Sequence, residues 1–374
     1  MTFVFWQGII SIHQKAFLEA LALQPGVEKV VLVVEEEITA YRKNMGWEVP
    51  VIEHITIVTA PAVAEIARLV AEHRSAVHVM GGIRVGKTMA AAFDACIKAD
   101  CKIGVMTEPY NPAGRKGMLR SIKYRYYRLR YFRHIQFVLA IGRQGVAQYH
   151  SLGYERSRIF PWAYFVNVPR ADDAARVQPG NKIIYAGRLE PAKGIYNFVN
   201  ELLAGNTGCT LDLYGAGPDE EKIRQLLAER DVTMRVSIFP FLLHEELLAK
   251  YSAYDWVVLP SSGKDGWGVI VSEGLLYGLR AICSSTCGVS WAIREGFNGV
   301  VFDWHREGDC KRAIEQVRHG AFAEPRDIAR WAEAALSGPA GAAYFLQIMA
   351  CVYGHEPRPG IPWEKTLDEI NASR

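Results

Sequence analysis

The stretch that decides the fold of this chain is Lys264-Asp265-Gly266-Trp267-Gly268-Val269-Ile270-Val271-Ser272-Glu273. The apolar run 256–259 precedes it and is typical of a buried parallel strand that ends at a loop. The residues 270–279 predict a helix closed by Gly278. A strand, a glycine turn and a helix N-terminus form an anion site, because free N–H groups and the helix dipole point at one place. Carboxylates cannot favour that anion, so we expect Asp265 and Glu273 to accept hydrogen bonds from hydroxyls. Phosphate beside hydroxyls suits a nucleotide-sugar.

Runs rich in Val, Ile and Leu alternate with helical patterns along the whole chain. The predicted strands are 2–6, 29–34, 76–80, 101–106, 137–141, 182–186, 210–214, 235–239, 256–259 and 280–283. Most are followed by glycine or by helix signals, which predicts parallel strands in two doubly wound α/β domains. We expect a first domain over 1–166, a linker over 167–181, a second domain over 182–335 and a helical tail over 336–374.

Composition excludes several classes of protein. A chain of 374 residues, half of them hydrophobic, has material for two cores. No apolar run reaches the length of a transmembrane helix, and the N-terminus lacks the basic region of a signal peptide. Seven scattered cysteines favour a reducing cytosol over a disulfide framework or a zinc site. The net charge of +3 gives no general attraction to nucleic acid, so we expect a cytoplasmic protein without a nucleic-acid partner.

Two further segments belong with the first. One reads IYAGRLEPAKG over 184–194, and the other reads LDLYGAGP over 211–218. In their order and spacing the three segments resemble the motifs of retaining glycosyltransferases of the GT-B class, family four (glycosyl transferases group 1). The opening stretch is similar to the E-x7-E signature of that family, with Asp265 in place of the first Glu. The other two are similar to its G-R-L-x-x-x-K-G element and its strand with a G-x-G turn.

The resemblance implies a GT-B fold: two Rossmann-like domains face a cleft, and a C-terminal helix crosses back to the first domain. It implies transfer of a sugar, with retention, from a nucleoside-diphosphate donor to a hydroxyl of a glycan or lipid-linked acceptor. Bacterial cell-surface polysaccharide or glycolipid synthesis is the expected setting. No Asp-x-Asp for a divalent metal is evident. Two cationic side chains can replace a divalent metal ion, so we expect neither a metal nor a cofactor besides the donor.

The resemblance also assigns roles to residues. Arg188 and Lys193 would hold the donor diphosphate, Glu273 the ribose hydroxyls, and Asp265 the transferred sugar, although its side chain is one methylene shorter than Glu. The remaining donor-side residues would be Gly187, Tyr214, Gly215, Gly217 and Phe241, with the N–H groups of Gly266, Trp267, Gly268 and Val269. On the acceptor or phosphate side the expected residues are Gly8, Ser11 and His13, which follow the first strand, and Glu108.

Other interpretations compete with this one. The segment Gly81-Gly82-Ile83-Arg84-Val85-Gly86-Lys87-Thr88 matches a phosphate-binding P-loop, G-x-x-x-x-G-K-[ST], in every position. However, no later apolar run closes with a clear Asp for the metal, which argues against an ATP-binding protein. A nucleotide-sugar epimerase of the same GT-B architecture and a non-catalytic membrane-surface protein are further alternatives.

The segment 115–134 has a composition unlike the rest of the chain. It reads RKGMLRSIKYRYYRLRYFRH, with eight Lys or Arg, five Tyr or Phe and no acid. On a helix Met118, Ile122, Leu129 and Phe132 share an apolar face. Either that face packs on the first sheet with the arginines in water, or the helix binds anionic headgroups at the inner face of the cytoplasmic membrane. Nucleic-acid binding is disfavoured because no recognised fold accompanies it.

Overall fold

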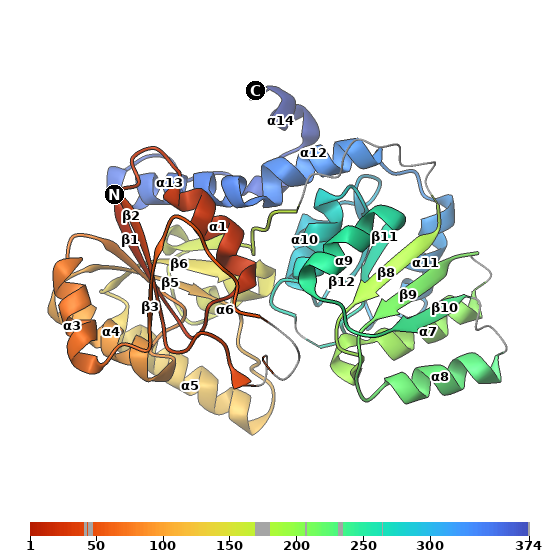
Figure 1. Cartoon of the computed structure of the whole chain (residues 1–374), viewed down its shortest axis with the longest axis horizontal. Helices are drawn as coiled ribbons and strands as arrows, with labels where there is room; N and C mark the ends of the chain where they lie inside the picture. The colour runs from red at the N-terminus through yellow and green to blue at the C-terminus, as the bar shows by residue number, and fades with distance from the viewer. Residues whose placement is uncertain are drawn as a thin grey trace. The chain divides into compact units, whose positions relative to one another are not determined.

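The computed structural model describes residues 1–374 except 41–42, 44–47, 169–179, 206–207, 231–234, 264 and 373–374. The chain divides into two compact units (Figure 1). Unit 1 comprises Met1–Val166 and Ser337–Pro362, and unit 2 comprises Asn167–Leu336 and Trp363–Arg374. Most of the predicted linker 167–181 lies outside the described residues. Among the described residues, no helix is long and apolar enough to cross a membrane.

Unit 1 is built on a seven-stranded parallel sheet of order β3-β2-β1-β4-β5-β6-β7. Its strands are β1 (Thr2–Gln7), β2 (Lys29–Val34), β3 (Thr56–Thr59), β4 (Val77–Met80), β5 (Lys102–Thr107), β6 (Ile135–Ile141) and β7 (Ile159–Trp162). Its helices are α1 (Ile12–Ala22), α3 (Val63–Glu72), α4 (Gly86–Lys98), α5 (Gly114–Tyr131), α6 (Gly142–Ser151) and α13 (Gly338–Gly354).

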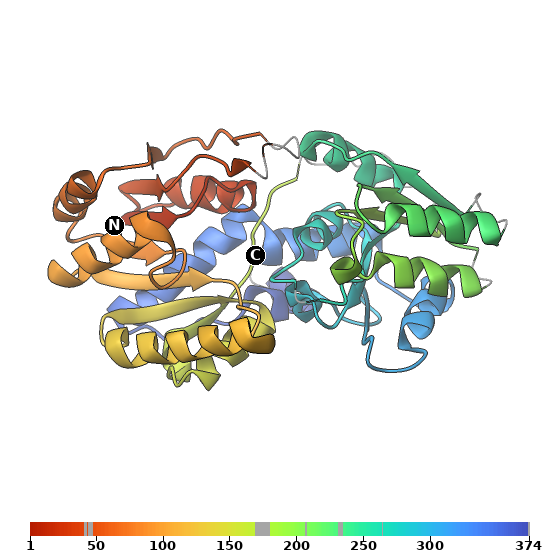
Figure 2. The ribbon, with the colours of Figure 1, turned by 90° about the horizontal axis from the view of Figure 1, so that it is seen from below.

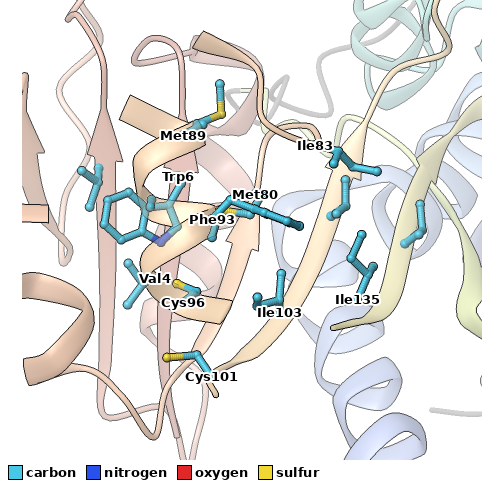
Figure 3. Packing of buried hydrophobic residues seen from close by; sticks show 14 of the residues in the cluster. Val4, Trp6, Met80, Ile83, Met89, Phe93, Cys96, Cys101, Ile103 and Ile135 are labelled. Atoms are coloured by element: carbon cyan, nitrogen blue, oxygen red, sulfur yellow. The ribbon is translucent and has the colours of Figure 1, made fainter. Parts of the chain in front are cut away.

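Helices cover both faces of this sheet because side chains alternate along each strand. Val4 and Trp6 of β1 point into the core beneath α3 and α4, where Figure 3 shows Trp6 beside Phe93. Phe3 and Phe5 point to the opposite face, where α1 and α13 lie. There the ring of Phe345 on α13 contacts those of Phe3 at 5.1 Å and Phe5 at 5.9 Å.

Unit 2 has a six-stranded parallel sheet of order β10-β9-β8-β11-β12-β13. Its strands are β8 (Lys182–Ala186), β9 (Thr210–Tyr214), β10 (Val236–Phe239), β11 (Trp256–Leu259), β12 (Arg280–Ser284) and β13 (Gly299–Phe302). Its helices are α7 (Ile195–Ala204), α8 (Glu220–Glu229), α9 (His244–Lys250), α10 (Val269–Leu276), α11 (Asp309–His319), α12 (Pro325–Leu336) and α14 (Leu367–Ala372). Helices α7 and α8 lie on one face of the sheet, and α10 packs against α12 on the other (Figure 2).

The two predicted doubly wound parallel sheets are confirmed. All ten predicted strands form within one or two residues of their expected bounds. Three strands that the sequence did not predict, β3, β7 and β13, all lie at the edges of the sheets. Each has four residues, and β7 contains Pro161, which an edge strand tolerates because only one side of its backbone must form a ladder.

The C-terminal tail differs from its prediction. Helix α13 packs on unit 1, where a Cβ at Gly338 would overlap the backbone of Ala16. Residues from Trp363 onward instead belong to unit 2, which corrects the prediction that all of 336–374 packs on the first domain. Two contacts hold this segment there. The ring of Trp363 lies 5.3 Å from that of Trp267, and Nε1 of Trp331 donates to the carbonyl of Lys365 at 2.9 Å.

The orientation of the basic helix also corrects a prediction. The segment forms α5, but Met118, Ile122 and Leu129 are exposed and do not pack on the sheet. The inward face instead carries tyrosines, with Tyr124 and Tyr131 packed against the core of unit 1. The interpretation in which the aliphatic side chains pack on the sheet is therefore wrong.

Candidate functional site in unit 2

The predicted donor residues meet where the strand order of unit 2 reverses. Strands β8 and β11 are neighbours at the centre of the sheet, and the chain leaves them in opposite directions along the sheet. Open α/β sheets bind ligands beyond the carboxyl ends of their strands at such a switch point. The motif segments that follow β8, β9 and β11 all begin at this edge of the sheet, so it carries all three of them.

An ion pair joins the loop 187–194 after β8 to the loop 260–268 after β11. The Nζ atom of Lys193 lies 2.6 Å from Oδ2 of Asp265, and Oγ of Ser261 donates to the same oxygen at 3.0 Å. Both charged side chains are about one fifth exposed, at 23% and 21%. Gly194 has a φ of 65°, and a Cβ there would overlap the carbonyl oxygen of Pro260. Only glycine therefore lets the two loops approach this closely.

Arg188 lies in the same loop and is half exposed. Its guanidinium pairs with Glu190 at 3.0 Å, and its carbonyl accepts a hydrogen bond from the Tyr185 hydroxyl at 2.7 Å. Burial raises the pKa of Tyr185, and the negative charge of Asp265 raises it further. Tyr185 therefore stays neutral and acts as a donor that fixes the backbone at Arg188.

Glu273 lies on α10 and is buried, with 3% of its surface exposed. Its Oε1 lies 2.7 Å from Nε2 of His244, and its Oε2 accepts from the Tyr251 hydroxyl at 3.1 Å. Burial lowers the pKa of His244, but the hydrogen bond and the charge of Glu273 outweigh it, so the pKa of His244 is raised. The sequence did not single out His244 or Tyr251. Each lies more than twenty residues from Glu273 in the chain, beyond the reach of a local motif.

Gly187, Gly215 and Gly217 have a structural role in the neighbouring loops. A Cβ at Gly215 would overlap the carbonyl oxygen of Gly187, and one at Gly217 would overlap that of Leu189. The N–H groups of Gly187 and Leu189 donate to the carbonyls of Tyr214 and Ala216 at 3.0 and 2.9 Å. The glycines thus extend the contact of β8 with β9 beyond the ends of the strands.

The helix N-terminus predicted for the anion is present. Gly268, with a φ of 113°, precedes α10, and a Cβ there would overlap the side chain of Leu259. Gly266 and Asp265 are anchored from the other side, because the N–H of Gly288 donates to the carbonyl of Asp265 at 3.1 Å. The Trp267 side chain points into the core and donates to Oγ of Ser272 at 2.9 Å, so Trp267 can offer a ligand its backbone only.

Aromatic side chains gather at the carboxyl end of β9 and β10. The buried ring of Tyr214 stacks on Phe239 at 4.9 Å, and its hydroxyl lies 2.9 Å from that of Tyr254. Phe241 is 42% exposed, in contrast to Tyr214. Of the two predicted donor-side aromatics, Phe241 is therefore exposed, whereas Tyr214 is buried and stacks on Phe239.

In unit 1 the predicted residues follow β1 and β5. Ser11 precedes α1, His13 lies in its first turn, and the space where a Cβ at Gly8 would lie is open. The ring of His13 lies 5.7 Å from that of Tyr164, whose hydroxyl donates to Oε1 of Glu108 at 2.7 Å. Tyr164, which the sequence did not single out, thus links His13 with Glu108.

The P-loop match forms a strand, a loop and a helix, but a carboxylate occupies the place of the phosphate. The N–H of Lys87 at the start of α4 donates to Oε1 of Glu35 at 3.1 Å. A Cβ at Gly86 would overlap the same carboxylate. The helix N-terminus that would bind an anion is therefore already neutralised by an acidic side chain from the end of β2.

Three potential metal ligands come together in the core of unit 1. The side-chain donor atoms of His78, Cys96 and Cys101 lie within 4.8 Å of one another and are buried. Nδ1 of His78 accepts from Nε1 of Trp6 at 3.1 Å, and its Nε2 lies 3.0 Å from the carbonyl oxygen of His73. Both nitrogens are thus engaged, and the cluster is part of the packing in this arrangement.

Comparison with solved structures places this geometry among known folds. HepE of Anabaena, solved in complex with UDP and glucose, has a TM-score of 0.69 and 13% identity, over 94% of this chain and 100% of that one. The apo form of the lipopolysaccharide outer core galactosyltransferase WaaB has a TM-score of 0.68 and 14% identity, over 94% of this chain and 99% of that one. At such identities the likeness shows the fold alone, and it confirms the predicted GT-B class.

Sequence comparison finds relatives that match less than half of this chain. Alpha-D-kanosaminyltransferase of Streptomyces kanamyceticus is 27% identical over 138 residues, which span 36% of each chain. D-inositol 3-phosphate glycosyltransferase of Nocardia farcinica is 26% identical over 188 residues, which span 44% of this chain and 40% of that protein. The family model described as glycosyl transferases group 1 matches residues 171–335, the segment that carries Arg188, Lys193, Asp265 and Glu273. The matched segment is less than half of the chain, and through it unit 2 is similar to the glycosyl transferases group 1 family.

Proposed function

We propose that this chain is a metal-independent retaining glycosyltransferase that moves a sugar from a nucleoside-diphosphate donor to a hydroxyl of a glycan or lipid-linked acceptor. The observation that carries the proposal is the Lys193–Asp265 ion pair, with Arg188 beside it, at the switch point of the unit 2 sheet. An ion pair at the carboxyl end of the strands places a cation for phosphate beside a carboxylate for hydroxyls.

The difficult part of the reaction is the charge that builds on the departing diphosphate. Arg188 offers a planar fork for two phosphate oxygens, and Lys193 offers a point charge. Both cations are held by neighbouring carboxylates, Glu190 and Asp265, so they are oriented before the donor arrives. Preorganised charge of this kind stabilises a developing anion without a metal ion.

The other donor groups have distinct tasks. Glu273 accepts hydrogen bonds from the ribose hydroxyls, with His244 and Tyr251 fixing its carboxylate. Asp265 uses the lone pairs that Lys193 and Ser261 leave open for hydroxyls of the sugar. Phe241 packs against the base with its exposed face.

Retention follows from a front-face mechanism. The acceptor hydroxyl attacks the anomeric carbon on the side from which the diphosphate leaves, and the departing phosphate oxygen takes the proton. This step needs no protein base, which fits a site whose carboxylates are already engaged. His13 and Glu108 of unit 1 then serve the acceptor or a phosphate. The name of WaaB supports cell-surface polysaccharide or glycolipid synthesis as the setting.

Nucleotide-induced thermal shifts with UDP, GDP, ADP and TDP identify the donor. The right nucleotide at a hundredfold excess over Kd should stabilise the protein by about 2–3 kcal/mol. With the matching α-linked sugar donor, transfer should survive EDTA, and NMR of the product should show an α linkage. Loss of transfer on chelation with recovery on adding manganese, a β-linked product, or epimerisation without an acceptor would each contradict the proposal.

A further inference from the structure

Helix α5 presents an apolar ridge outward. Of its large apolar side chains, five are between 57% and 77% exposed, and we define these as the α5 ridge: Met118, Leu119, Ile122, Tyr126 and Leu129. At 3.6 residues per turn they fall within an arc of roughly 100°. Scattered exposed apolar residues are ordinary, but a contiguous row along one helix face marks an interaction surface.

The opposite face of α5 fixes this orientation. The ring of Tyr124 stacks on Tyr110 at 4.7 Å, and the Tyr110 hydroxyl donates to Oγ of Ser121 at 3.2 Å. The ring of Tyr131 meets that of Phe93 at 5.2 Å. A Cβ at Gly117 would overlap the backbone of Pro112, so even alanine cannot be accommodated there without a shift. Rotating the helix to bury the ridge would break all of these contacts.

Positive charge surrounds the ridge. Eight Lys or Arg lie between 115 and 133, and no Asp or Glu occurs between 109 and 154. Arg125 lies along one side of the ridge, and Lys123 and Arg130 lie along the other, at helical spacing. Within the described residues, none of the eight basic side chains forms a salt bridge with a carboxylate. Arg128 points inward and donates to the carbonyl of Gly153 at 3.0 Å.

We propose that α5 is a membrane-binding surface that lies flat on an anionic phospholipid bilayer. The ridge enters the boundary between headgroups and acyl chains, and the flanking cations bind lipid phosphates. The helix has 18 residues and is about 27 Å long, so the ridge and its cations act along one line. This inference goes beyond sugar transfer, because it assigns a surface on unit 1 that transfer to a soluble acceptor does not need.

Charge selects the lipid surface over the other occupants. A second copy of this chain, related by a two-fold axis, would place the same cations opposite one another, which repel. Nucleic acid would satisfy the cations but leave the aliphatic ridge in water. An anionic bilayer offers phosphates to the cations and an apolar interior to the ridge.

The test measures sedimentation of the full chain with vesicles of phosphatidylcholine alone or with phosphatidylglycerol added. The wild-type protein should bind the anionic vesicles at least about tenfold more strongly. Two double variants separate the contribution of the ridge from that of the flanking positive charge. Ile122→Ser with Leu129→Ser interrupts the ridge and keeps the charge, whereas Arg125→Glu with Arg130→Glu keeps the ridge. Each should weaken binding to anionic vesicles at least about tenfold, and the charge variant should lose its difference from wild type in about 1 M salt, where screening is strong.

The matched control is Leu23→Ser, which changes another aliphatic side chain of unit 1 that is 64% exposed. It should bind vesicles as the wild type does. All variants should keep the thermal midpoint, nucleotide binding and transfer to a soluble acceptor, so that failure of this inference is distinct from failure of the proposed function. Equal binding to neutral and anionic vesicles, wild-type binding by the ridge variant, or a wild-type dimer that the ridge variant dissociates without any change in vesicle binding would each overturn it.

Discussion

The ammonium group of Lys193 lies 2.6 Å from the carboxylate of Asp265, although 72 residues separate them in the chain. The pair joins the loops after β8 and β11, and Ser261 adds a hydrogen bond to the same carboxylate oxygen at 3.0 Å. In the proposed function, a donor diphosphate would share Lys193 with Asp265. The carboxylate orients the cation and would also oppose the phosphate charge.

This sharing predicts how Asp265→Asn behaves. Because the change removes a negative charge from the phosphate site, affinity for the free nucleoside diphosphate should stay within about threefold or increase, whereas turnover should fall at least about tenfold. Isothermal titration of the nucleotide and initial transfer rates measure the two effects. A loss of nucleotide affinity that matches the loss of turnover would contradict this division of roles.

Glu273→Gln should lower nucleotide affinity as well as turnover, unlike Asp265→Asn. Glu273 is buried and holds His244 at 2.7 Å, and an amide accepts only through its oxygen. Weaker ribose contacts should lower both nucleotide affinity and turnover. Comparison with a nucleotide that lacks the 2′-hydroxyl provides the control, since the variant should lose discrimination between the two ligands. Unchanged discrimination would show that Glu273 does not contact the ribose.

The glycine turn after β9 makes a stability prediction. A Cβ at Gly215 would overlap the Gly187 carbonyl, which is backbone and cannot rotate away. Gly215→Ala should therefore destabilise unit 2 by about 1–3 kcal/mol, as overpacking does. Gly360→Ala is the control, because nothing lies within 4 Å of the Cβ position there. Scanning calorimetry of both variants checks the difference, and equal midpoints would refute the role assigned to Gly215.

Most of the fold could be predicted because runs such as Lys29–Val34 and Trp256–Leu259 lie in sheet interiors, where both faces demand apolar side chains. The edge strands β3 and β7 were missed for different reasons. Strand β3 is short and only partly buried, whereas β7 is buried but contains Pro161, which argues against a strand. The rotation of α5 was predicted wrongly for a different reason. Its aliphatic residues form the more hydrophobic stripe, but the helix is held by tyrosines whose partners, Phe93 and Tyr110, lie elsewhere in the chain.

The candidate site shows the same limit. Arg188, Lys193, Asp265 and Glu273 were found from short motifs, each within a single loop or helix. Their partners were not, because contacts such as Glu273 with His244 form only in the folded chain. The P-loop match is the converse case. The motif is complete in sequence, and the carboxylate that neutralises it comes from Glu35, 52 residues earlier.

The raised pKa of His244 predicts a pH-dependent stability. Glu273 raises this pKa above the unfolded value of 6.5, against the effect of burial. The protonated pair is therefore fully stabilising below about pH 6.5, and its contribution is lost as the pH rises through the folded pKa. His244→Gln keeps a donor for Glu273 and removes the charge. It should cost more free energy of unfolding near pH 6 than near pH 9. In a Glu273→Gln background that difference should disappear, and its persistence would assign the effect to another group.

Two lysines decide between the two phosphate motifs. If the diphosphate rests on unit 2, Lys193→Ala removes a charge-assisted hydrogen bond worth about 1.5–3 kcal/mol, or roughly ten- to hundredfold in nucleotide affinity or turnover. Lys87 is exposed at a helix N-terminus that already holds the carboxylate of Glu35. Lys87→Ala should therefore leave nucleotide affinity within about twofold.

Glu35→Gln sharpens the test, because it frees that helix end of negative charge. If tight binding of ATP with magnesium then appeared, or if Lys87→Ala alone lost nucleotide affinity, the P-loop motif would be the functional one. If Lys87→Ala and Glu35→Gln both retain nucleotide affinity and Lys193→Ala loses it, the donor binds at the switch point of unit 2.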